Sequence, residues 1–269
     1  MKNAPLPVVL AHGWNSHPGA WNRLIARLDE AHIPWVRFDH TGMAGRPLSD
    51  IAAELGRFIT KWREDSAYDG AIDLISHSVG TCIARYYLEV CDGTAHKEKV
   101  RQLIGLGPPN NGSALAELFV HPEHGPAIID RLTGIFVPAG FDPGSDRMVQ
   151  DVRPRSPFME QLRAAGTRPD ITYRIIVTAN PVGAGEFFPL FAGKTWMLAG
   201  DNEFRQTLAG DGIVAHAESV LPGVSLDVIS APFTAEENLP PPDQYCHIHL
   251  TKNPRINDRI LAYLTGSAP

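Results

Sequence analysis

Short, continuous runs of apolar residues alternate along the chain with longer stretches in which apolar residues recur every three or four positions. A continuous run is typical of a parallel strand buried on both faces, whereas the longer period indicates an amphipathic helix. The alternation predicts an α/β fold with a doubly wound, mostly parallel sheet. The predicted strands cover residues 8–11, 35–38, 71–75, 100–106, 171–178 and 225–229.

Helices are predicted between these strands and after the last one, among them 21–28, about 79–90 and about 256–264. Ser49 and Asp50 precede the most regular apolar stripe, and we expect their side-chain oxygens to cap that helix by accepting hydrogen bonds from its first amides. The stripe consists of Ile51, Leu55, Phe58, Ile59 and Trp62.

The regular alternation stops from about 112 to 166, where prolines are frequent and no strand is predicted. Plain loops of this length are uncommon in compact domains. We therefore predict a single domain spanning residues 1–269, with a helical cap inserted over one end of the sheet. A second irregular stretch holds the aromatic segment 187–191, and with the cap it indicates a hydrophobic pocket.

Composition narrows the possible partners. The chain has 269 residues, of which 43% are hydrophobic and 20% charged, and its formal net charge is −6. These values are typical of a globular protein with one substantial core. Because nucleic-acid binding requires concentrated lysine and arginine, the acidic balance and the lack of a basic run argue against such a partner. Nothing in the sequence fixes the oligomeric state.

No apolar run approaches the roughly 18 residues that a membrane-spanning helix requires. Residues 1–5 lead almost directly into the first strand and leave no room for a signal peptide. We therefore expect a cytoplasmic protein without an integral membrane segment, the alternative being a secreted protein whose leader has been removed. The cysteines, Cys82, Cys91 and Cys246, are odd in number and are expected to be reduced, buried thiols.

Ser78 lies where the strand 71–75 turns into the following helix. A side chain on such a tight turn is held clear of the sheet, and the residues two positions away on either side must be small. Ser76 and Gly80 meet this requirement. The hydroxyl also lies at the positive end of the helix. The pattern predicts a nucleophile elbow, the ordinary alternative being a serine that only caps the helix.

A serine nucleophile needs a base, and the base needs an acid that orients it. In doubly wound hydrolases both follow the serine in sequence, on loops at the carboxyl ends of strands. Asp211, between two glycines, and Asp201 are the candidate acids, a solvated turn being the alternative for Asp211. The candidate bases are His247 and His249. A His-x-His pair supplies only two ligands, fewer than a protein metal site uses, so we expect no metal.

The first predicted strand ends in a histidine, a glycine and a tryptophan. Gly13 allows the main chain to approach the elbow, so we expect the amides of Trp14 and Val79 to point at a developing oxyanion. One such donor typically contributes about 100- to 1000-fold in rate. The alternative is a turn followed by a core tryptophan. We also expect His12, Gly13 and His77 to contribute to substrate binding.

Taken together, these segments resemble the α/β-hydrolase superfamily, and within it the bacterial lipases and GPI-inositol-deacylase-like serine esterases. The resemblance covers nearly the whole chain. Ser76 and Thr81 depart from it, since glycine is frequent at both positions in the family, and a tighter elbow is expected. The matching segments are residues 12–14, 75–80, 107–113, 210–214 and 247–254.

The resemblance implies the roles of the site residues. It favours Asp211 over Asp201 as the acid and His247 over His249 as the base, with Ser78 as the nucleophile. The implied activity is hydrolysis of carboxylic esters through an acyl-enzyme and without a cofactor. The apolar cap and the aromatic segment indicate that the acyl group of the ester is apolar. An acyltransferase or thioesterase with the same triad is the first alternative. A non-catalytic binding protein of the same fold is the second.

Overall fold

The structure is a computed structural model that describes residues 5–232 and 239–267. Residues 1–4, on which the expectation of no signal peptide partly rests, lie outside the described residues. Within the described part of the chain, no helix is both long enough and apolar enough to cross a membrane.

The centre of the molecule is a six-stranded sheet in which every neighbouring pair of strands is parallel. The strands lie in the order β2-β1-β3-β4-β5-β8. The central strands β1 and β3 are buried along their whole length, which explains their continuous apolar runs. The bounds are β1 Val8–Ala11, β2 Trp35–Phe38, β3 Ile72–His77, β4 Val100–Leu106, β5 Thr172–Ala179 and β8 Leu226–Ser230.

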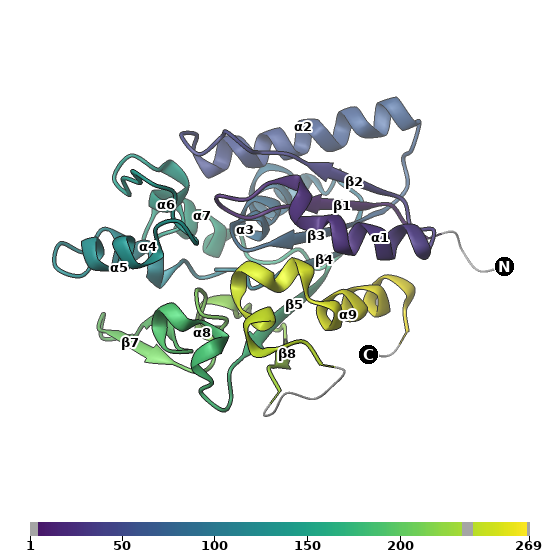
Figure 1. The fold of residues 1–269 in the computed structure, drawn as a ribbon. Coiled ribbons are helices and arrows are strands. Elements are labelled where there is room, and N and C mark those ends of the chain that lie inside the picture. The colour runs from purple at the N-terminus through teal and green to yellow at the C-terminus, as the bar shows by residue number, and fades with distance from the viewer. Residues whose placement is uncertain (1–4, 233–238, 268–269) are drawn as a thin grey trace.

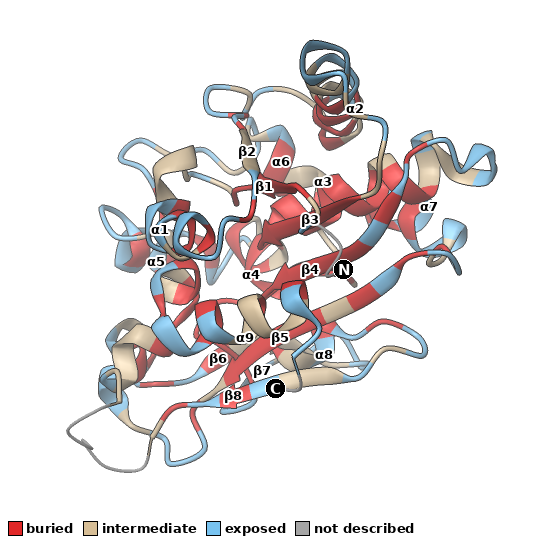
Figure 2. Cartoon of the chain, turned by 90° about the vertical axis from the view of Figure 1, so that its right-hand side faces the viewer, coloured by how far each residue is buried: buried red, intermediate tan, exposed pale blue. Residues whose placement is uncertain are grey.

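Helices cover both faces of this sheet (Figure 1). On one face α1 (Asn22–Glu30) packs beside α9 (Pro254–Thr265), and on the other α2 (Leu48–Ser66) packs beside α3 (Val79–Tyr86). Figure 2 shows the buried residues gathered on the strands and on the helix surfaces that face them. The predicted doubly wound, mostly parallel sheet is confirmed.

The predicted cap of α2 is wrong. The helix begins at Leu48, so Ser49 and Asp50 lie inside its first turn and make no capping hydrogen bond. The Leu48 N–H donates instead to Oδ2 of Asp151, at 2.8 Å. Asp151 belongs to α6 (Arg147–Asp151), far along the chain. Local sequence therefore could not reveal the acceptor.

The segment 112–166 contains short helices that gather at one end of the sheet (Figure 1). Each helix is short, with nine residues at most. Its helices are α4 (Ala114–Phe119), α5 (Gly125–Leu132), α6 and α7 (Pro157–Ala165). We call this segment the helical insertion.

Two strands were missed by the sequence pattern. β6 (Thr195–Leu198) and β7 (Phe204–Thr207) form an antiparallel hairpin apart from the main sheet. Each strand is only four residues long and mostly half-exposed or exposed, so neither gives a continuous apolar run. The short helix α8 (His216–Ser219) follows this hairpin.

The helix after Ser78 was predicted to reach about residue 90. In the structure α3 ends at Tyr86 and continues as a π-helical turn, Tyr87–Cys91. Cys91 lies at the end of this turn and is exposed, whereas Cys82 and Cys246 are buried. The prediction of three buried thiols is therefore wrong for Cys91.

The order of the strands reverses at β1, because the chain adds β2 on one side of β1 and the later strands on the other side. β2 lies on one side of β1, and β3 lies on the other. In open parallel sheets, ligands bind at the carboxyl ends of the strands that flank such a switch point. Residues that directly follow β1 and β3 therefore lie where a site is expected.

Candidate active site

Ser78 occupies a strained turn between β3 and α3. Its φ of 55° and ψ of −131° lie in a region that non-glycine residues rarely adopt. The Ser78 N–H donates to the carbonyl oxygen of Leu106, at 2.9 Å, which fixes the turn against β4. A Cβ on Gly80 would lie 2.3 Å from the carbonyl oxygen of His12, so only glycine fits there. The turn thus has the geometry of a nucleophile elbow.

The two residues that depart from the family pattern contact each other. Ser76 and Thr81 are fully buried, and the Ser76 hydroxyl donates to Oγ1 of Thr81 at 2.9 Å. Thr81 packs so closely on β4 that a Cβ on Gly105 would lie 2.9 Å from its methyl group. The glycine that makes room is therefore on the neighbouring strand.

The structure brings Ser78, His247 and Asp211 together. Nε2 of His247 lies 2.9 Å from Oγ of Ser78, and Nδ1 lies 2.7 Å from Oδ2 of Asp211. His247 and Asp211 are both 1% exposed. Since a carboxylate only accepts hydrogen bonds, the contact with Asp211 favours the tautomer in which Nδ1 carries the proton. Nε2 is then free to accept the Ser78 proton.

The loop after β7 holds the Asp211 carboxylate in place. Its Oδ1 accepts hydrogen bonds from the amides of Ile213, at 3.0 Å, and Val214, at 2.7 Å. This leaves Oδ2 for the imidazole. A Cβ on Gly107, whose φ is +53°, would lie 2.5 Å from that Oδ2, so the glycine keeps the space open. The two amides thus hold Oδ1 of Asp211 in place, and Oδ2 points at His247.

The alternative acid and base lie elsewhere. Asp201 is in the β6–β7 turn and pairs with Arg205. His249 follows His247 in a 3₁₀ helix, His247–Lys252, and contacts neither Ser78 nor Asp211 in the described structure. Of the four candidates, Asp211 and His247 are the pair that the fold places beside the serine.

Two backbone amides adjoin the elbow without a protein acceptor. Within the described residues, neither the Trp14 N–H nor the Val79 N–H donates to the protein. A Cβ on Gly13 would lie 3.0 Å from Cβ of Ser78, so the β1 loop passes directly against the elbow. Neither amide is therefore committed to a protein partner in the described structure.

An apolar cavity of about 40 Å³ lies beside Ser78. Trp14 and Val79 line it near the serine, and the helical insertion supplies much of the remaining wall, including Leu115, Phe119, Phe136, Met148 and Val149. The cavity is small, and its lining is mostly apolar.

The segment 187–191 does not line this cavity. Phe187, Phe188 and Phe191 are almost fully buried in the core. The Phe188 ring packs so closely under the acid loop that a Cβ on Gly212 would lie 2.7 Å from it. The expectation that these rings form part of an acyl pocket is therefore wrong, because they support the acid loop instead.

Neither histidine expected to bind substrate lines the cavity. The His77 ring lies 4.6 Å from that of His247, and its Nε2 contacts the His247 carbonyl oxygen at 3.1 Å. Burial holds the pKa of His77 well below its usual value, so the ring is neutral. His12 stacks on His40 with ring centres 3.7 Å apart. Both rings, like Gly13, shape the backbone around Ser78 rather than the cavity.

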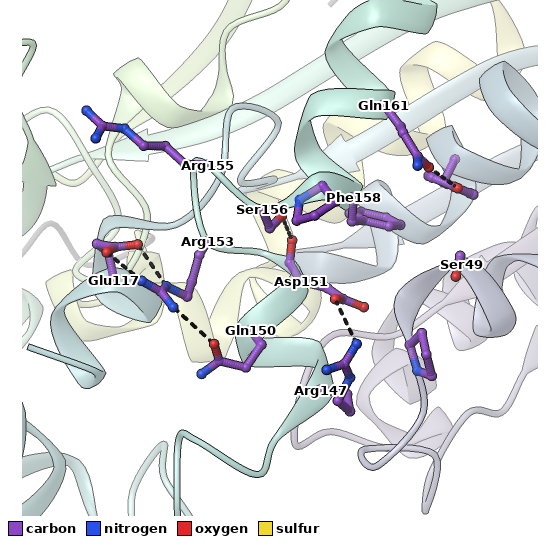
Figure 3. A pocket seen from close by; sticks show the side chains of 13 residues that line it. Ser49, Glu117, Arg147, Gln150, Asp151, Arg153, Arg155, Ser156, Phe158 and Gln161 are labelled. Atoms are coloured by element: carbon purple, nitrogen blue, oxygen red, sulfur yellow. Dashed lines mark hydrogen bonds and ion pairs between the residues drawn. The ribbon is translucent and has the colours of Figure 1, made fainter.

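A larger hollow lies on the other side of α6 and does not include Ser78 (Figure 3). Its volume is about 810 Å³, and polar side chains dominate its lining. Arg147 and Gln150 of α6 face this groove, whereas Met148 and Val149 face the apolar cavity. Figure 3 shows Arg153 bridging Glu117 and Gln150, which ties α4 to α6. This hollow therefore lies against the polar side of the helical insertion, away from the apolar cavity.

Sequence reasoning missed Asp146. Its Oδ2 accepts the indole N–H of Trp14 at 2.9 Å, and its Oδ1 accepts the Val149 amide at 3.0 Å, which caps α6. An aspartate shortly before the apolar pair Met148 and Val149 is a typical N-cap pattern, so the start of this helix could have been predicted from the sequence. The pairing with Trp14, 132 positions away, was not.

No cluster of three or more histidine, cysteine or acidic side chains suited to a metal occurs among the described residues. The side chains near Ser78 are suited to proton transfer instead, since they consist of one hydroxyl, one imidazole and one carboxylate in contact.

Comparisons with known proteins agree with this architecture. The model of the Alpha/beta hydrolase family matches residues 8–258. A search of curated protein sequences finds no match. Among solved structures, the chain is similar to mature Bacillus licheniformis lipase BlEst2, with a TM-score of 0.69 and 19% identity over 97% of this chain and 93% of that chain.

Two further structures show the same fold. Aspergillus fumigatus lipase B has a TM-score of 0.63 and 15% identity, covering 100% of this chain and 54% of that chain. The metagenomic carboxyl esterase MGS0156 has a TM-score of 0.58 and 17% identity, covering 99% and 77%. At such identities the likeness shows the fold alone. Because the family model spans every strand of the sheet, however, the protein belongs to the alpha/beta hydrolase family.

Proposed function

We propose that the protein is a serine hydrolase that cleaves carboxylic esters with an apolar acyl group. The observation that carries this proposal is the continuous contact from Ser78 through His247 to Asp211. The strained elbow, the two amides without a protein acceptor and the apolar cavity beside Ser78 support it. The similar structures described as lipases and a carboxyl esterase are in accord with it.

In the proposed reaction, Oγ of Ser78 attacks the ester carbonyl carbon while Nε2 of His247 takes the hydroxyl proton. Asp211 stabilises the resulting imidazolium, and the amides of Trp14 and Val79 bind the oxyanion. The imidazolium then gives its proton to the leaving alcohol as the C–O bond breaks. Water, deprotonated by His247, releases the acid from the acyl-enzyme and restores Ser78. The proposed steps require no metal or organic cofactor.

The helical insertion, residues 112–166, is proposed to act as the cap of this single domain. The cavity beneath it is small, and α6 is proposed to shift so that a substrate longer than acetate can bind. α6 is suited to this role because its apolar side chains face Ser78 and its polar ones face the groove.

Hydrolysis of nitrophenyl esters tests the proposal. We expect the wild type to release nitrophenol from acetate, butyrate and octanoate esters, and Ser78→Ala to reduce the rate to that of the buffer. A burst of one nitrophenol per protein molecule identifies the acyl-enzyme. A folded wild type that hydrolyses none of the three esters would contradict the proposed activity. Turnover limited strictly to acetate would contradict the apolar acyl pocket.

A further inference from the structure

Glu218 is a buried acid to which the proposed reaction gives no role. It lies on α8 and is 8% exposed. None of the ion pairs in the described part of the chain includes it, and no cation is among the groups that shift its pKa. An acid buried without a cation is costly unless its oxygens are hydrogen-bonded. The role of Glu218 must therefore be sought in the hydrogen bonds that its carboxyl group accepts.

The two carboxyl oxygens of Glu218 accept amides from two different segments. Oε1 accepts the Ala114 N–H at 2.7 Å, and Oε2 accepts the Ala215 N–H at 3.1 Å. The bond to Ala215 is the ordinary local one, in which the third residue of a helix reaches back to its start. The bond to Ala114, which begins α4, crosses 104 positions and has no local explanation.

Ala215 closes the loop that carries the acid. It pairs with Gly210 in an isolated β-bridge, and the Asp211 N–H donates to the Val214 carbonyl at 3.1 Å inside that bridge. The amides of Ile213 and Val214 hold Oδ1 of Asp211 from the same loop. A group that fixes Ala215 therefore fixes the position of the Asp211 carboxylate.

Ala114 begins the helix that forms one wall of the apolar cavity. Leu115, Ala116 and Phe119 of α4 line that cavity beside Ser78. Glu218 thus joins the loop of the acid to the wall of the proposed acyl pocket through one side chain.

Asn110 and Asn111 reinforce the same junction. The Asn111 N–H donates to the Glu218 carbonyl oxygen at 2.9 Å. The Asn110 amide group donates to the Ser219 carbonyl at 2.7 Å, and that of Asn111 to Val220 at 2.9 Å and Ala217 at 3.3 Å. The segment 107–113, which the sequence analysis singled out without a role, is therefore docked on α8.

The protonation of Glu218 fits a buried structural acid. Burial raises its pKa to about 8, and the charge of Asp211 acts in the same direction. The two amide hydrogen bonds lower the pKa but do not offset burial. The role of Glu218 therefore follows from its hydrogen bonds to Ala114 and Ala215 rather than from its pKa.

We propose that Glu218 is a positioning residue for this site: its carboxyl group locks the acid loop 210–215 to the start of α4, so that Asp211 and the pocket wall keep one relative geometry. The inference rests on the proposed function. Glu218 does not touch the reacting atoms and acts only through Asp211 and α4.

Glu218→Gln tests this role. The amide keeps the shape of the side chain, but only its oxygen accepts a hydrogen bond, and its NH₂ group faces the second donor. We expect kcat for nitrophenyl acetate to fall about 10- to 100-fold, because small displacements of a catalytic group have effects of this size. KM should stay within about twofold, because acetate makes little use of the wall.

A second variant removes the donor of the hydrogen bond between Ala114 and Glu218. Ala114→Pro deletes the N–H that Glu218 accepts, at a first-turn position where proline suits a helix. Ser113 is already extended (φ −104°, ψ 120°), as a residue before proline must be. We expect a folded protein whose kcat falls as in Glu218→Gln, and a double variant no worse than either alone.

The matched control is Ser219→Ala, because this neighbouring hydroxyl is buried and has no partner in the described structure. It should behave as the wild type. A proton resonance far downfield, from Nδ1–H of His247, gives a readout that does not require turnover: both Glu218→Gln and Ala114→Pro should shift or broaden it.

The proposal is overturned if folded Ala114→Pro and Glu218→Gln keep the wild-type kcat and the wild-type resonance, or if Ser219→Ala loses as much activity as they do. Should Glu218→Gln not fold, Ala114→Pro decides the matter alone. An inactive wild type would contradict the proposed function instead, and the resonance would then still test the positioning.

Discussion

At the scale of single residues, the hydroxyls of Ser76 and Thr81 replace two glycines that are frequent in the family, and they satisfy each other. We expect Ser76→Ala and Thr81→Val each to lower the free energy of unfolding by about 1 to 2 kcal/mol, because each removes the hydrogen bond between the two buried hydroxyls. The double variant should cost less than the sum of the two. Urea denaturation measures all three, and strictly additive losses would show that the hydroxyls are not coupled.

Asp211 makes a sharper prediction, because its two oxygens have different neighbours. Oδ1 faces two amide donors, so in Asp211→Asn the side-chain oxygen must take that place and the NH₂ group must face His247. The imidazole then carries its proton on Nε2 and cannot accept from Ser78. We expect kcat for nitrophenyl acetate to fall about 10⁴-fold.

The control for Asp211→Asn is Asp201→Asn, which alters the rival acid in the β6–β7 turn and should leave kcat unchanged. A large loss in Asp201→Asn together with a small loss in Asp211→Asn would reverse the assignment of the acid.

At the scale of elements, Asp146 joins α6 to the β1 loop. It caps α6 through Val149 and also accepts the Trp14 indole N–H. We expect Asp146→Ala to lower the free energy of unfolding by about 1 to 2 kcal/mol through loss of the cap and of the hydrogen bond. Limited proteolysis should cut the helical insertion faster than in the wild type, because α6 loses its anchor.

Asp130→Ala is the matched control for this change, since Asp130 is an exposed residue of α5 within the same insertion. Equal proteolysis of both variants would mean that the Trp14–Asp146 contact does not hold α6 in place.

The elements also show where sequence reasoning succeeds. Continuous apolar runs located all six strands of the main sheet within a residue or two, because burial on both faces leaves a strong signal. The hairpin β6–β7 gave no such signal, because its short strands are mostly half-exposed or exposed. The cap of α2 was misassigned because its acceptor, Asp151, comes from the insertion.

The same contrast holds for the site. Ser78 was found from the strand-to-helix turn around it, whereas the family resemblance selected Asp211 over Asp201 and His247 over His249. The structure places the three residues in contact. Glu218 and Asp146 were not found, because their decisive hydrogen bonds join residues more than 100 positions apart. The aromatic segment 187–191 was misread because a core aromatic and a pocket aromatic look alike in sequence.

At the scale of the whole molecule, buried histidines set how stability depends on pH. Burial lowers the pKa of His40 to about 4, with the stacked His12 acting in the same direction. The unfolded chain takes up this proton near pH 6.5 and the folded protein only near pH 4. The contribution of His40 is therefore fully present above pH 6.5 and is lost as pH falls toward 4, by about 3 kcal/mol.

His40→Gln should flatten this part of the stability curve, and His32→Gln, at an exposed histidine, should not. The difference in unfolding free energy between each variant and the wild type, measured by urea denaturation from pH 4 to 7, isolates the effect. Glu218 has the opposite slope, since its raised pKa reduces stability between pH 4.5 and about 8, and it cancels in this difference. A difference that does not change with pH would contradict a neutral, buried His40.

The most direct test of an activated serine at position 78 is covalent labelling by a fluorophosphonate, read by intact mass and peptide mapping. The account predicts one adduct per folded molecule, located on Ser78, that is absent in Ser78→Ala and much slower to form in His247→Ala. A folded wild type that stays unlabelled, or an adduct on another residue, would contradict it.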